Sequence, residues 1–309
     1  MNTQGHYIVD FDPFAVRFPE SFFVEGIRWY GLAYLAGFVI AYLLLNLYTS
    51  RGRSPLSKDD NSTFITYLLF GVIIGGRLGY MLFYDFSGFC ENPLTVFYIW
   101  KGGMASHGGF IGVVAAIMAY CFARKVGFWT LSDMIVTICT PGIFLGRIAN
   151  FINGELWGKI SDVKWAMIFP HSAPSGTPLE QIAPRHPSQL YEAFGEGLFL
   201  FLFLQYRFWR GNLPRGQLSG EFLLLYGIIR IVCEIFREPD VGVEPILGLS
   251  RGTFYSCICV ICGIAIIAWA RLSNKHSGKS ARGSWAKNNW IYRIFFEFFY
   301  LKKNSRKIK

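Results

Sequence analysis

The chain has 309 residues, of which 52% are hydrophobic and 16% are charged, and its formal net charge is +10. Several stretches of about 20 residues carry almost no charge, which is the length of a bilayer-spanning helix and excludes an ordinary soluble domain. A basic chain could bind nucleic acid, but the excess charge lies in loops and in the C-terminal tail, as in membrane proteins. We therefore expect an all-α integral membrane protein that contacts membrane lipids and has no nucleic-acid partner.

The N-terminal residues 1–25 contain several charged side chains and no apolar core, so we do not expect a cleaved signal peptide. Seven apolar segments then follow, each read as a transmembrane helix. They span residues 27–48, 63–84, 107–123, 130–149, 189–206, 218–236 and 253–270.

The distribution of Lys and Arg predicts the orientation. The connections on one side, together with the tail from residue 271, hold 19 of the 30 basic residues. The positive-inside rule then places the N-terminus outside and the C-terminus in the cytoplasm. Without the tail the two sides are equal, although the connections on the inner side are shorter and denser in positive charge.

A change in composition divides the chain into two parts. Residues 1–279 contain the seven segments and form the expected membrane domain. Residues 280–309 are aromatic and basic, as in an interfacial helix that binds anionic headgroups, but a disordered tail fits that composition equally well.

The seven cysteines do not suggest a metal or redox site. Cys259 and Cys262 have the C-x-x-C spacing, but no second pair and no nearby histidine accompanies them. We expect them to pack as small apolar residues, and we expect no bound metal.

The most informative polar cluster closes the fourth apolar segment. Arg147 is followed one helical turn later by Asn150, and then by Asn153, Glu155 and Gly158. Ionisable residues are costly in hydrocarbon and usually mark a function. Arg147 alone could be an interfacial arginine that reaches the headgroups, but the neighbouring Asn and Glu side chains favour a polar site.

A second cluster, Ser106-His107-Gly108-Gly109, opens the third segment on the outer side. Ser106 can cap the helix, which places His107 in the first turn. The positive end of the helix dipole disfavours a charged imidazole there, so a neutral His107 could accept a proton. The two glycines would let a ligand approach the backbone. On its own, this motif favours a lone interfacial histidine.

The fifth segment opens with the polar sequence HPSQLYE, residues 186–192. Pro187 suits the first helical position, and Gln189, Tyr191 and Glu192 then enter the membrane at the outer face. An interfacial aromatic role is the alternative for Tyr191. That alternative does not suit Glu192, which precedes a long apolar run.

The sixth segment carries Tyr226, Arg230, Glu234 and Arg237 along one helical face. Arg230 and Glu234 could simply neutralise each other as a buried pair. The positive charges on this face nevertheless suit an anionic ligand. Arg77 lies deeper, in the second segment, and we expect a structural or supporting role for it.

These clusters all fall at the outer membrane face. Arg147, Arg230 and Arg237 would bring three guanidinium groups together with few acids beside them, which suits a phosphate. A site at that depth, open to lipid, would fit a phospholipid headgroup.

At these residues the sequence resembles the prolipoprotein diacylglyceryl transferase family, over about residues 5–272. The family pattern Gly-Arg-x-x-Asn-Phe-x-Asn-x-Glu-x-x-Gly is matched at every fixed position by Gly146, Arg147, Asn150, Phe151, Asn153, Glu155 and Gly158. Further matches are RWYG (28–31), GRLGY (76–80), HGG (107–109), HPSQLYE (186–192), the series Tyr226, Arg230 and Glu234, and FREPD (236–240).

The resemblance implies an activity, a place and two substrates. The enzyme would move the diacylglyceryl group of phosphatidylglycerol to the lipobox cysteine of a preprolipoprotein signal peptide. The products would be a thioether-linked lipoprotein precursor and glycerol phosphate, the first step of bacterial lipoprotein maturation. The protein would lie in the bacterial cytoplasmic (inner) membrane as a multi-pass protein, with its site at the outer leaflet and no cofactor.

The residue pattern fits that chemistry. A thiol of pKa ~8.5 must lose its proton to attack well, so a neutral His107 is a candidate base, although it could instead orient the lipid. Arg147 and Arg230 would bind the phosphate, and Tyr30 and Tyr226 the headgroup or glycerol hydroxyls. We expect the remaining members of the lipid-binding set to be Asn150, Asn153, Glu155, Gly158, His186, Gln189, Glu234 and Arg237.

Three other functions are weighed against this one. A flippase or transporter of anionic phospholipid would place polar groups near the middle of the membrane and in both halves of the chain. A lipid-binding scaffold explains the arginines but not the His, Asn and Glu residues near them. An enzyme that attacks phosphorus would normally need a metal and a set of carboxylates.

Overall fold

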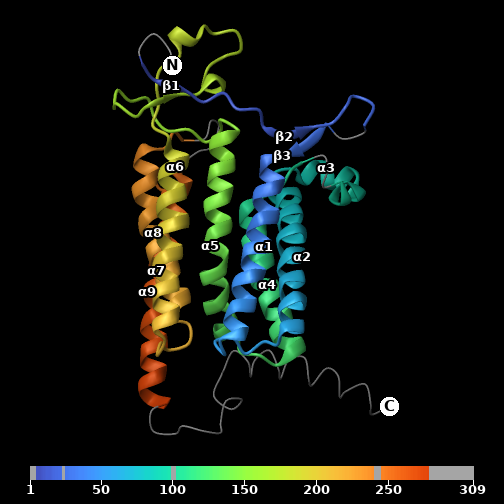
Figure 1. Cartoon of the computed structure of the whole chain (residues 1–309), viewed down its shortest axis with the longest axis vertical. Helices are drawn as coiled ribbons and strands as arrows, with labels where there is room; N and C mark the ends of the chain where they lie inside the picture. Colours follow the sequence, from blue (N-terminus) through green and yellow to red (C-terminus); the bar gives the residue numbers. More distant parts are fainter. Residues whose placement is uncertain (1–4, 23–24, 99–101, 240–244, 278–309) are drawn as a thin grey trace.

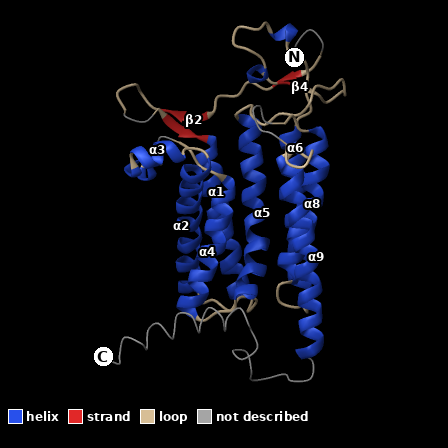
Figure 2. Ribbon diagram, turned by 180° about the vertical axis from the view of Figure 1, so that it is seen from behind, coloured by secondary structure: helices blue, strands red, loops and turns tan. Residues whose placement is uncertain are grey.

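The computed structural model describes residues 5–22, 25–98, 102–239 and 245–277, and the predicted tail 280–309 lies outside them. The chain forms a bundle of long helices with short strands and loops gathered at one end (Figures 1 and 2). The helices are α1 (Trp29–Ser50), α2 (Lys58–Phe83), α3 (Phe86–Glu91), α4 (Ser106–Arg124), α5 (Phe128–Ile152), α6 (Ser188–Glu192), the π-helical segment η5 (Ala193–Phe199), α7 (Leu200–Arg210), α8 (Gln217–Phe236) and α9 (Arg251–Ser277). Short 3₁₀ turns are η1 (Pro93–Phe97), η3 (Pro170–Ser172) and η4 (Leu179–Gln181).

All seven predicted apolar segments are helical, which confirms the all-α class for the membrane part. Among the described residues, five helices are long and apolar enough to cross a membrane: Trp29–Ser50, Lys58–Phe83, His107–Arg124, Phe128–Ile152 and Arg251–Asn274. The fifth and sixth segments are helical over α6–η5–α7 and α8, but both carry charged residues within their length. The count of seven transmembrane helices therefore stays a prediction.

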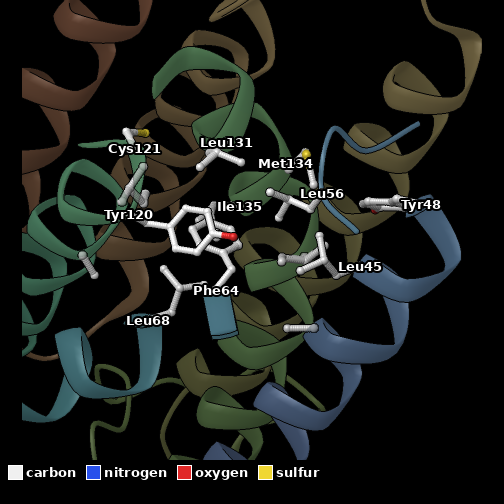
Figure 3. Close-up of a cluster of buried hydrophobic side chains, with 14 residues drawn as sticks. Leu45, Tyr48, Leu56, Phe64, Leu68, Tyr120, Cys121, Leu131, Met134 and Ile135 are labelled. Carbon is white, nitrogen blue, oxygen red and sulfur yellow. The ribbon is translucent and has the colours of Figure 1, made fainter. Parts of the chain in front are cut away.

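Helix α5 lies between two groups of helices. Helices α1, α2 and α4 stand on one side of it, and α6, α7, α8 and α9 on the other (Figures 1 and 2). Apolar side chains of α1, α2, α4 and α5 form the larger core, in which Tyr48, Phe64, Tyr120 and Leu131 have no exposed surface (Figure 3).

Glycines bring α2 and α4 into backbone contact. A Cβ atom at Gly112 would lie 1.9 Å from the carbonyl oxygen of Gly71, and one at Gly108 would lie 2.2 Å from that of Gly75. Small residues at this spacing are the usual means by which membrane helices approach closely. Because α4 begins at Ser106, this contact also fixes the position of His107.

Side-chain caps define where two of the helices begin. Ser57 and Asp60 form a reciprocal capping box at the start of α2, with the Ser57 hydroxyl accepting from the Asp60 amide at 3.1 Å. At the start of α8 the cap comes from another helix. The Asp133 carboxylate of α5 accepts from the amides of Gly216 at 2.7 Å and Ser219 at 2.8 Å. Free N–H groups at a helix start favour such a negative partner.

The strands lie at the end of the bundle where α1 begins and α5 ends (Figure 1). Strand β1 (Tyr7–Ile8) pairs in parallel with β4 (Met167–Ile168), which ties the N-terminal segment to the connection after α5. Strands β2 (Phe14–Arg17) and β3 (Gly26–Arg28) form an antiparallel pair that leads directly into α1. The starts of α4 and α6 and the end of α8 lie at this same end. The four polar clusters therefore lie at one end of the bundle, whereas their position at the outer membrane face stays a prediction.

Candidate functional site

Two buried carboxylates form the centre of the site. Glu192 is the last residue of α6, and Glu196 lies in the π-helical turn that follows, and neither side chain has exposed surface. Buried carboxylates are stable in an apolar surrounding only when they are paired with cations or hydrogen-bond donors. Here the partners are three arginines: one in α5, one in α8, and one that directly follows α8.

Arg147 of α5 contacts both carboxylates. Its Nη1 lies 2.8 Å from Glu192 Oε2, and its Nη2 donates to Glu196 Oε2 at 2.9 Å. Its Nε also donates to Glu196 Oε2, at 3.3 Å. The Arg147 side chain is 17% exposed, compared with 10% for Arg230 and 9% for Arg237.

The arginines at the end of α8 contact the same carboxylates. Arg230 Nη1 is hydrogen-bonded to Glu192 and lies 3.5 Å from Glu196 Oε1, while its Nη2 lies 2.7 Å from Glu234 Oε2. Arg237, directly after α8, contacts Glu192 Oε1 through Nη1 at 3.4 Å. We call Arg147, Glu192, Glu196, Arg230, Glu234 and Arg237 the arginine–carboxylate cluster.

One premise of the sequence analysis is therefore wrong. The arginines were expected to have few acids beside them, but the cluster holds as many carboxylates as guanidinium groups. The suggested pairing of Arg230 with Glu234 is observed. A phosphate would meet guanidinium groups that are already positioned and largely neutralised, rather than an open positive pocket.

Asn150 joins the start of α1 to the end of α5. Its Nδ2 donates to the Tyr30 hydroxyl at 2.5 Å and to Glu155 Oε1 at 2.9 Å. Asn150 is 3% exposed, so both contacts are sheltered from solvent. The structure thus brings together three predicted site residues, Tyr30, Asn150 and Glu155, from two distant parts of the sequence.

The loop after α5 is held against α6 by hydrogen bonds to its backbone. Gln189 Nε2 donates to the carbonyl of Glu155 at 2.7 Å, and Ser188 Oγ donates to that of Leu156 at 3.0 Å. Leu156 has a left-handed backbone with φ of 58°, which is uncommon for a residue with a side chain. These contacts keep the loop next to the arginine–carboxylate cluster.

Gly158 lies where two chain segments close on the loop. Its amide donates to the carbonyl of His186 at 2.9 Å, and it forms a β-bridge with Arg237. A Cβ atom here would lie 2.5 Å from the His186 carbonyl oxygen and 2.6 Å from that of Phe236. Only glycine fits without movement of the backbone, so Gly158 acts here through close packing.

His186 and Asn153 lie at the margin of the site. The His186 ring shares a hydrogen bond with the Tyr191 hydroxyl at 3.1 Å, and burial lowers the pKa of its imidazole, which favours the neutral ring. Asn153 ends α5, and its Oδ1 is buried without a hydrogen-bond partner among the described atoms. Tyr226 of α8 stacks on Phe222, with 5.6 Å between the ring centroids.

His107 lies in the first turn of α4, as predicted, with an exposed side chain. Its ring packs against Tyr255 of α9, with 4.9 Å between ring centroids. Among the residues that the structure describes, it makes neither a hydrogen bond nor an ion pair. The N-cap position of α4 is occupied by Ala105, and Ser106 is the first residue of the helix. The predicted hydrogen bond from the Ser106 side chain lies outside what the structure describes.

Arg77 has the supporting role that was expected. It is 5% exposed, and its guanidinium donates to the backbone carbonyls of Thr95 at 2.5 Å, Val96 at 3.2 Å, Gly103 at 3.0 Å and Gly102. These bonds attach the segment before α4 to α2.

Glu196 was not among the site residues predicted from the sequence, and Glu192 was named there without being assigned to the site. The signal was available, because two acids four residues apart in an apolar run lie on one helical face. Among the described residues, no group of three or more His, Cys, Asp or Glu side chains is arranged to hold a metal ion.

Comparison with known proteins identifies the family. The family model described as prolipoprotein diacylglyceryl transferase matches residues 19–269. Three similar relatives are each named phosphatidylglycerol–prolipoprotein diacylglyceryl transferase. The relative from Pseudoalteromonas translucida is 45% identical over 245 residues, 79% of this chain and 88% of that protein. The relative from Rhodopseudomonas palustris is 44% identical over 272 residues, 84% of this chain and 91% of that protein. The relative from Proteus mirabilis is 41% identical over 281 residues, which cover 84% of this chain and 95% of that protein. With a match over most of its length and the motif residues gathered at one end of the bundle, this chain belongs to the prolipoprotein diacylglyceryl transferase family.

Proposed function

We propose that this chain transfers the diacylglyceryl group of phosphatidylglycerol to the thiol of a lipobox cysteine in a preprolipoprotein signal peptide. The observation that carries the proposal is the arginine–carboxylate cluster, which lies beside the Asn150–Tyr30–Glu155 contact at one end of the bundle. Membership in the family and the names of the relatives support it. The chain would then catalyse the first step of lipoprotein maturation.

The reaction forms one bond and breaks one. The sulfur of the peptide cysteine forms a bond to the terminal glycerol carbon of the lipid, and the bond from that carbon to the phosphate oxygen breaks. The thiol proton passes to a base, and glycerol phosphate leaves. The nucleophile belongs to the substrate, so the enzyme must supply proton acceptance, orientation and stabilisation of the leaving phosphate.

Arg147 and Arg230 would stabilise the leaving phosphate. Charge gathers on its oxygens as the carbon–oxygen bond breaks, and prepositioned guanidinium donors stabilise such charge by several kcal/mol or more. Arg147 is the most exposed arginine of the cluster, so it would meet the phosphate first. Arg237 and Tyr226 would complete the headgroup site.

His107 would accept the thiol proton. Its exposed ring has no hydrogen-bond partner among the described residues, which leaves it free to contact the peptide cysteine. Tyr30, held by Asn150, would orient a glycerol hydroxyl, and Glu155 would fix Asn150. The positions of His186, Gln189, Asn153 and Gly158 suit the shaping of this pocket rather than the chemistry.

The membrane arrangement is part of the proposal. We infer seven transmembrane helices, with α6–η5–α7 as the fifth and α8 as the sixth, the N-terminus outside and the C-terminus in the cytoplasm of a bacterial cell. Charged residues of these two helices form ion pairs with one another, namely Arg207 with Glu221 and Arg230 with Glu192 and Glu196, which reduces the cost of placing them in a membrane. The site would then open at the outer leaflet of the inner membrane, where secreted precursors arrive.

A direct assay tests the activity. The purified protein is placed in phosphatidylglycerol vesicles with a synthetic lipobox peptide, and mass spectrometry follows the peptide. We expect a diacylglyceryl adduct on the cysteine and release of glycerol phosphate, and no adduct on a peptide with serine in place of that cysteine. Folded protein that yields no adduct, or one that moves labelled lipid between leaflets instead, would contradict the proposal.

A further inference from the structure

The arginine–carboxylate cluster contains more negative charge than phosphate binding requires. Its formal charges cancel, because three guanidinium groups face three carboxylates. Glu192 and Glu196 have no exposed surface and accept contacts from Arg147 and Arg230. Keeping two carboxylates in that position has a desolvation cost, so their negative charge needs a reason beyond packing.

The proposed reaction changes the charge of the phosphate. Phosphatidylglycerol is a phosphodiester with one negative charge. When the carbon–sulfur bond forms and the carbon–oxygen bond breaks, the thiol proton leaves and the released glycerol phosphate is a monoester. A phosphate monoester has a second pKa near 6 and therefore carries about −1.5 to −2 charges at pH 7. The product is thus more negative than the substrate by nearly one charge.

Carboxylates next to the guanidinium groups oppose that added charge. Glu192 and Glu196 lie 2.8 Å and 2.9 Å from the Arg147 nitrogens, so a phosphate on the other side of that guanidinium would be about 6 Å from them. At that separation and an effective dielectric constant of about 20, one unit charge changes an affinity by on the order of 100-fold. The guanidinium groups, which are nearer, still stabilise the charge that builds up on the phosphate, but the carboxylates reduce this gain for every unit of charge. The cost of removing an ion from water rises with the square of its charge, so the reduced gain offsets that cost for one negative charge and not for two.

We propose that Glu192 and Glu196 determine specificity for charge: they hold the arginines in place and make the site prefer a singly charged phosphodiester over a doubly charged phosphomonoester. The glycerol phosphate product is then expelled once it forms. This inference rests on the transferase activity proposed above, and it adds two residues that touch the arginines rather than the substrate.

Two soluble probes test the preference in the unaltered protein. Glycerophosphoglycerol, the deacylated headgroup, is a singly charged diester, and glycerol phosphate is the doubly charged monoester. Inhibition of diacylglyceryl transfer by each probe gives two inhibition constants at pH 8. We expect the diester to inhibit more strongly. Equal or stronger inhibition by the monoester would overturn the inference without any variant.

Glu196→Gln and Glu192→Gln then test the cause. Each removes one negative charge and keeps the shape, so inhibition by the monoester should strengthen relative to the diester by about ten-fold or more. A purely structural role would weaken both probes alike and leave their ratio unchanged, which would contradict the inference. The matched control is Glu221→Gln. It removes the negative charge that pairs with Arg207 at 2.6 Å, near the opposite end of α7 and α8. This change should leave the ratio of the two inhibition constants unaltered.

The two proposals fail in different ways. If the unaltered protein forms no adduct on the lipobox peptide, the transferase activity itself is wrong. If it forms the adduct but the monoester and the diester inhibit alike in all variants, the activity stands and the role assigned to Glu192 and Glu196 is wrong.

Discussion

At the scale of single residues, the site depends on ion pairs that are shielded from water. Glu192 contacts Arg147, Arg230 and Arg237, and removal of one arginine would leave the buried cluster with one negative charge in excess. Breaking such a pair commonly costs about 3–5 kcal/mol. Substitutions in the cluster therefore affect folding as well as activity, and conservative changes are the more informative ones.

Arg147→Lys separates charge from geometry. Lysine keeps the positive charge but cannot donate to two carboxylates and a phosphate through one planar group. We expect transfer to fall by about 100-fold while expression and membrane insertion remain near normal, because an oxyanion-type donor is worth roughly that much. The rate of adduct formation under saturating lipid measures this. A rate within two- to three-fold of the unaltered protein would remove Arg147 from the catalytic set.

Tyr30→Phe tests whether the Tyr30 hydroxyl acts on the substrate. If it only accepts the hydrogen bond from Asn150, its loss should cost about 0.5–1.5 kcal/mol, or roughly ten-fold in rate at most. We expect a larger fall, because the hydroxyl would also bind the lipid glycerol. The control is Tyr34→Phe on the same helix, whose ring stacks on Tyr30 at 5.9 Å. Equal effects of the two changes would assign Tyr30 a packing role.

At the scale of elements, close helix packing determines where the site residues lie. Gly112 on α4 faces Gly71 on α2, and the space between them does not admit a methyl group. The capping of α8 by Asp133 acts similarly at the other end of the bundle, because it fixes where α8 begins relative to α5.

Gly112→Ala should destabilise the α2–α4 pair. The new Cβ atom would lie 1.9 Å from the Gly71 carbonyl oxygen, and overpacking of this kind costs about 1–3 kcal/mol. We expect a lower thermal midpoint in detergent and a lower transfer rate, because α4 carries His107. Gly142→Ala in α5 is the control, since its Cβ would meet Gly37 at an ordinary 3.8 Å. Equal thermal midpoints for the two variants would show that the close α2–α4 contact at Gly112 does not limit the stability of the protein.

Asp133→Ala should weaken the start of α8. The Asp133 carboxylate satisfies two backbone amides and the Ser219 hydroxyl, and loss of a helix cap costs about 0.5–2 kcal/mol. Asp133→Asn keeps one acceptor oxygen and should lose less. Thermal unfolding of the purified variants measures the order. An alanine variant as stable as the asparagine variant would argue against the cap.

At the scale of the whole molecule, α5 connects two groups of helices, and the site forms where they meet at one end (Figure 1). Arg147 comes from α5, the carboxylates from α6 and η5, and Arg230 from α8. Tyr30 enters from α1 on the other side of α5. No single segment contains the site, so its integrity reports on the assembly of the whole bundle.

The orientation can be tested by chemical labelling. Cys90 of α3 is exposed at the end of the bundle that holds the site, and Asn212 is exposed in the connection from α7 to α8 at the opposite end. In variants that keep only one cysteine, Cys90 or a cysteine in place of Asn212, a membrane-impermeant thiol reagent is added to spheroplasts. We expect labelling of Cys90 from outside and labelling at position 212 only after lysis. The reverse pattern would place the site in the cytoplasm.

Much of the architecture follows from the sequence. Seven apolar segments correspond to seven helical regions, because uncharged runs of that length can satisfy their backbone in a membrane only as helices. The alignment of Arg230 and Glu234 on one face of α8 also follows from helical periodicity. The motif around Arg147 and Asn150 indicated the family, which the comparisons then confirmed.

The sequence by itself determined the helical segments, the polar clusters and their common end, because each depends on local composition and helical spacing. Only the tertiary structure decided which charges neutralise one another. Glu192 and Glu196 contact Arg147, which lies 45 and 49 residues before them in the sequence. They also contact Arg230 and Arg237, which lie 34 to 45 residues after them. Contacts over such separations are set by how α5, α6 and α8 pack. The sequence shows which charged groups are present, but which of them pair depends on their distances in the folded protein. In this structure those distances give a cluster in which the carboxylates neutralise the arginines.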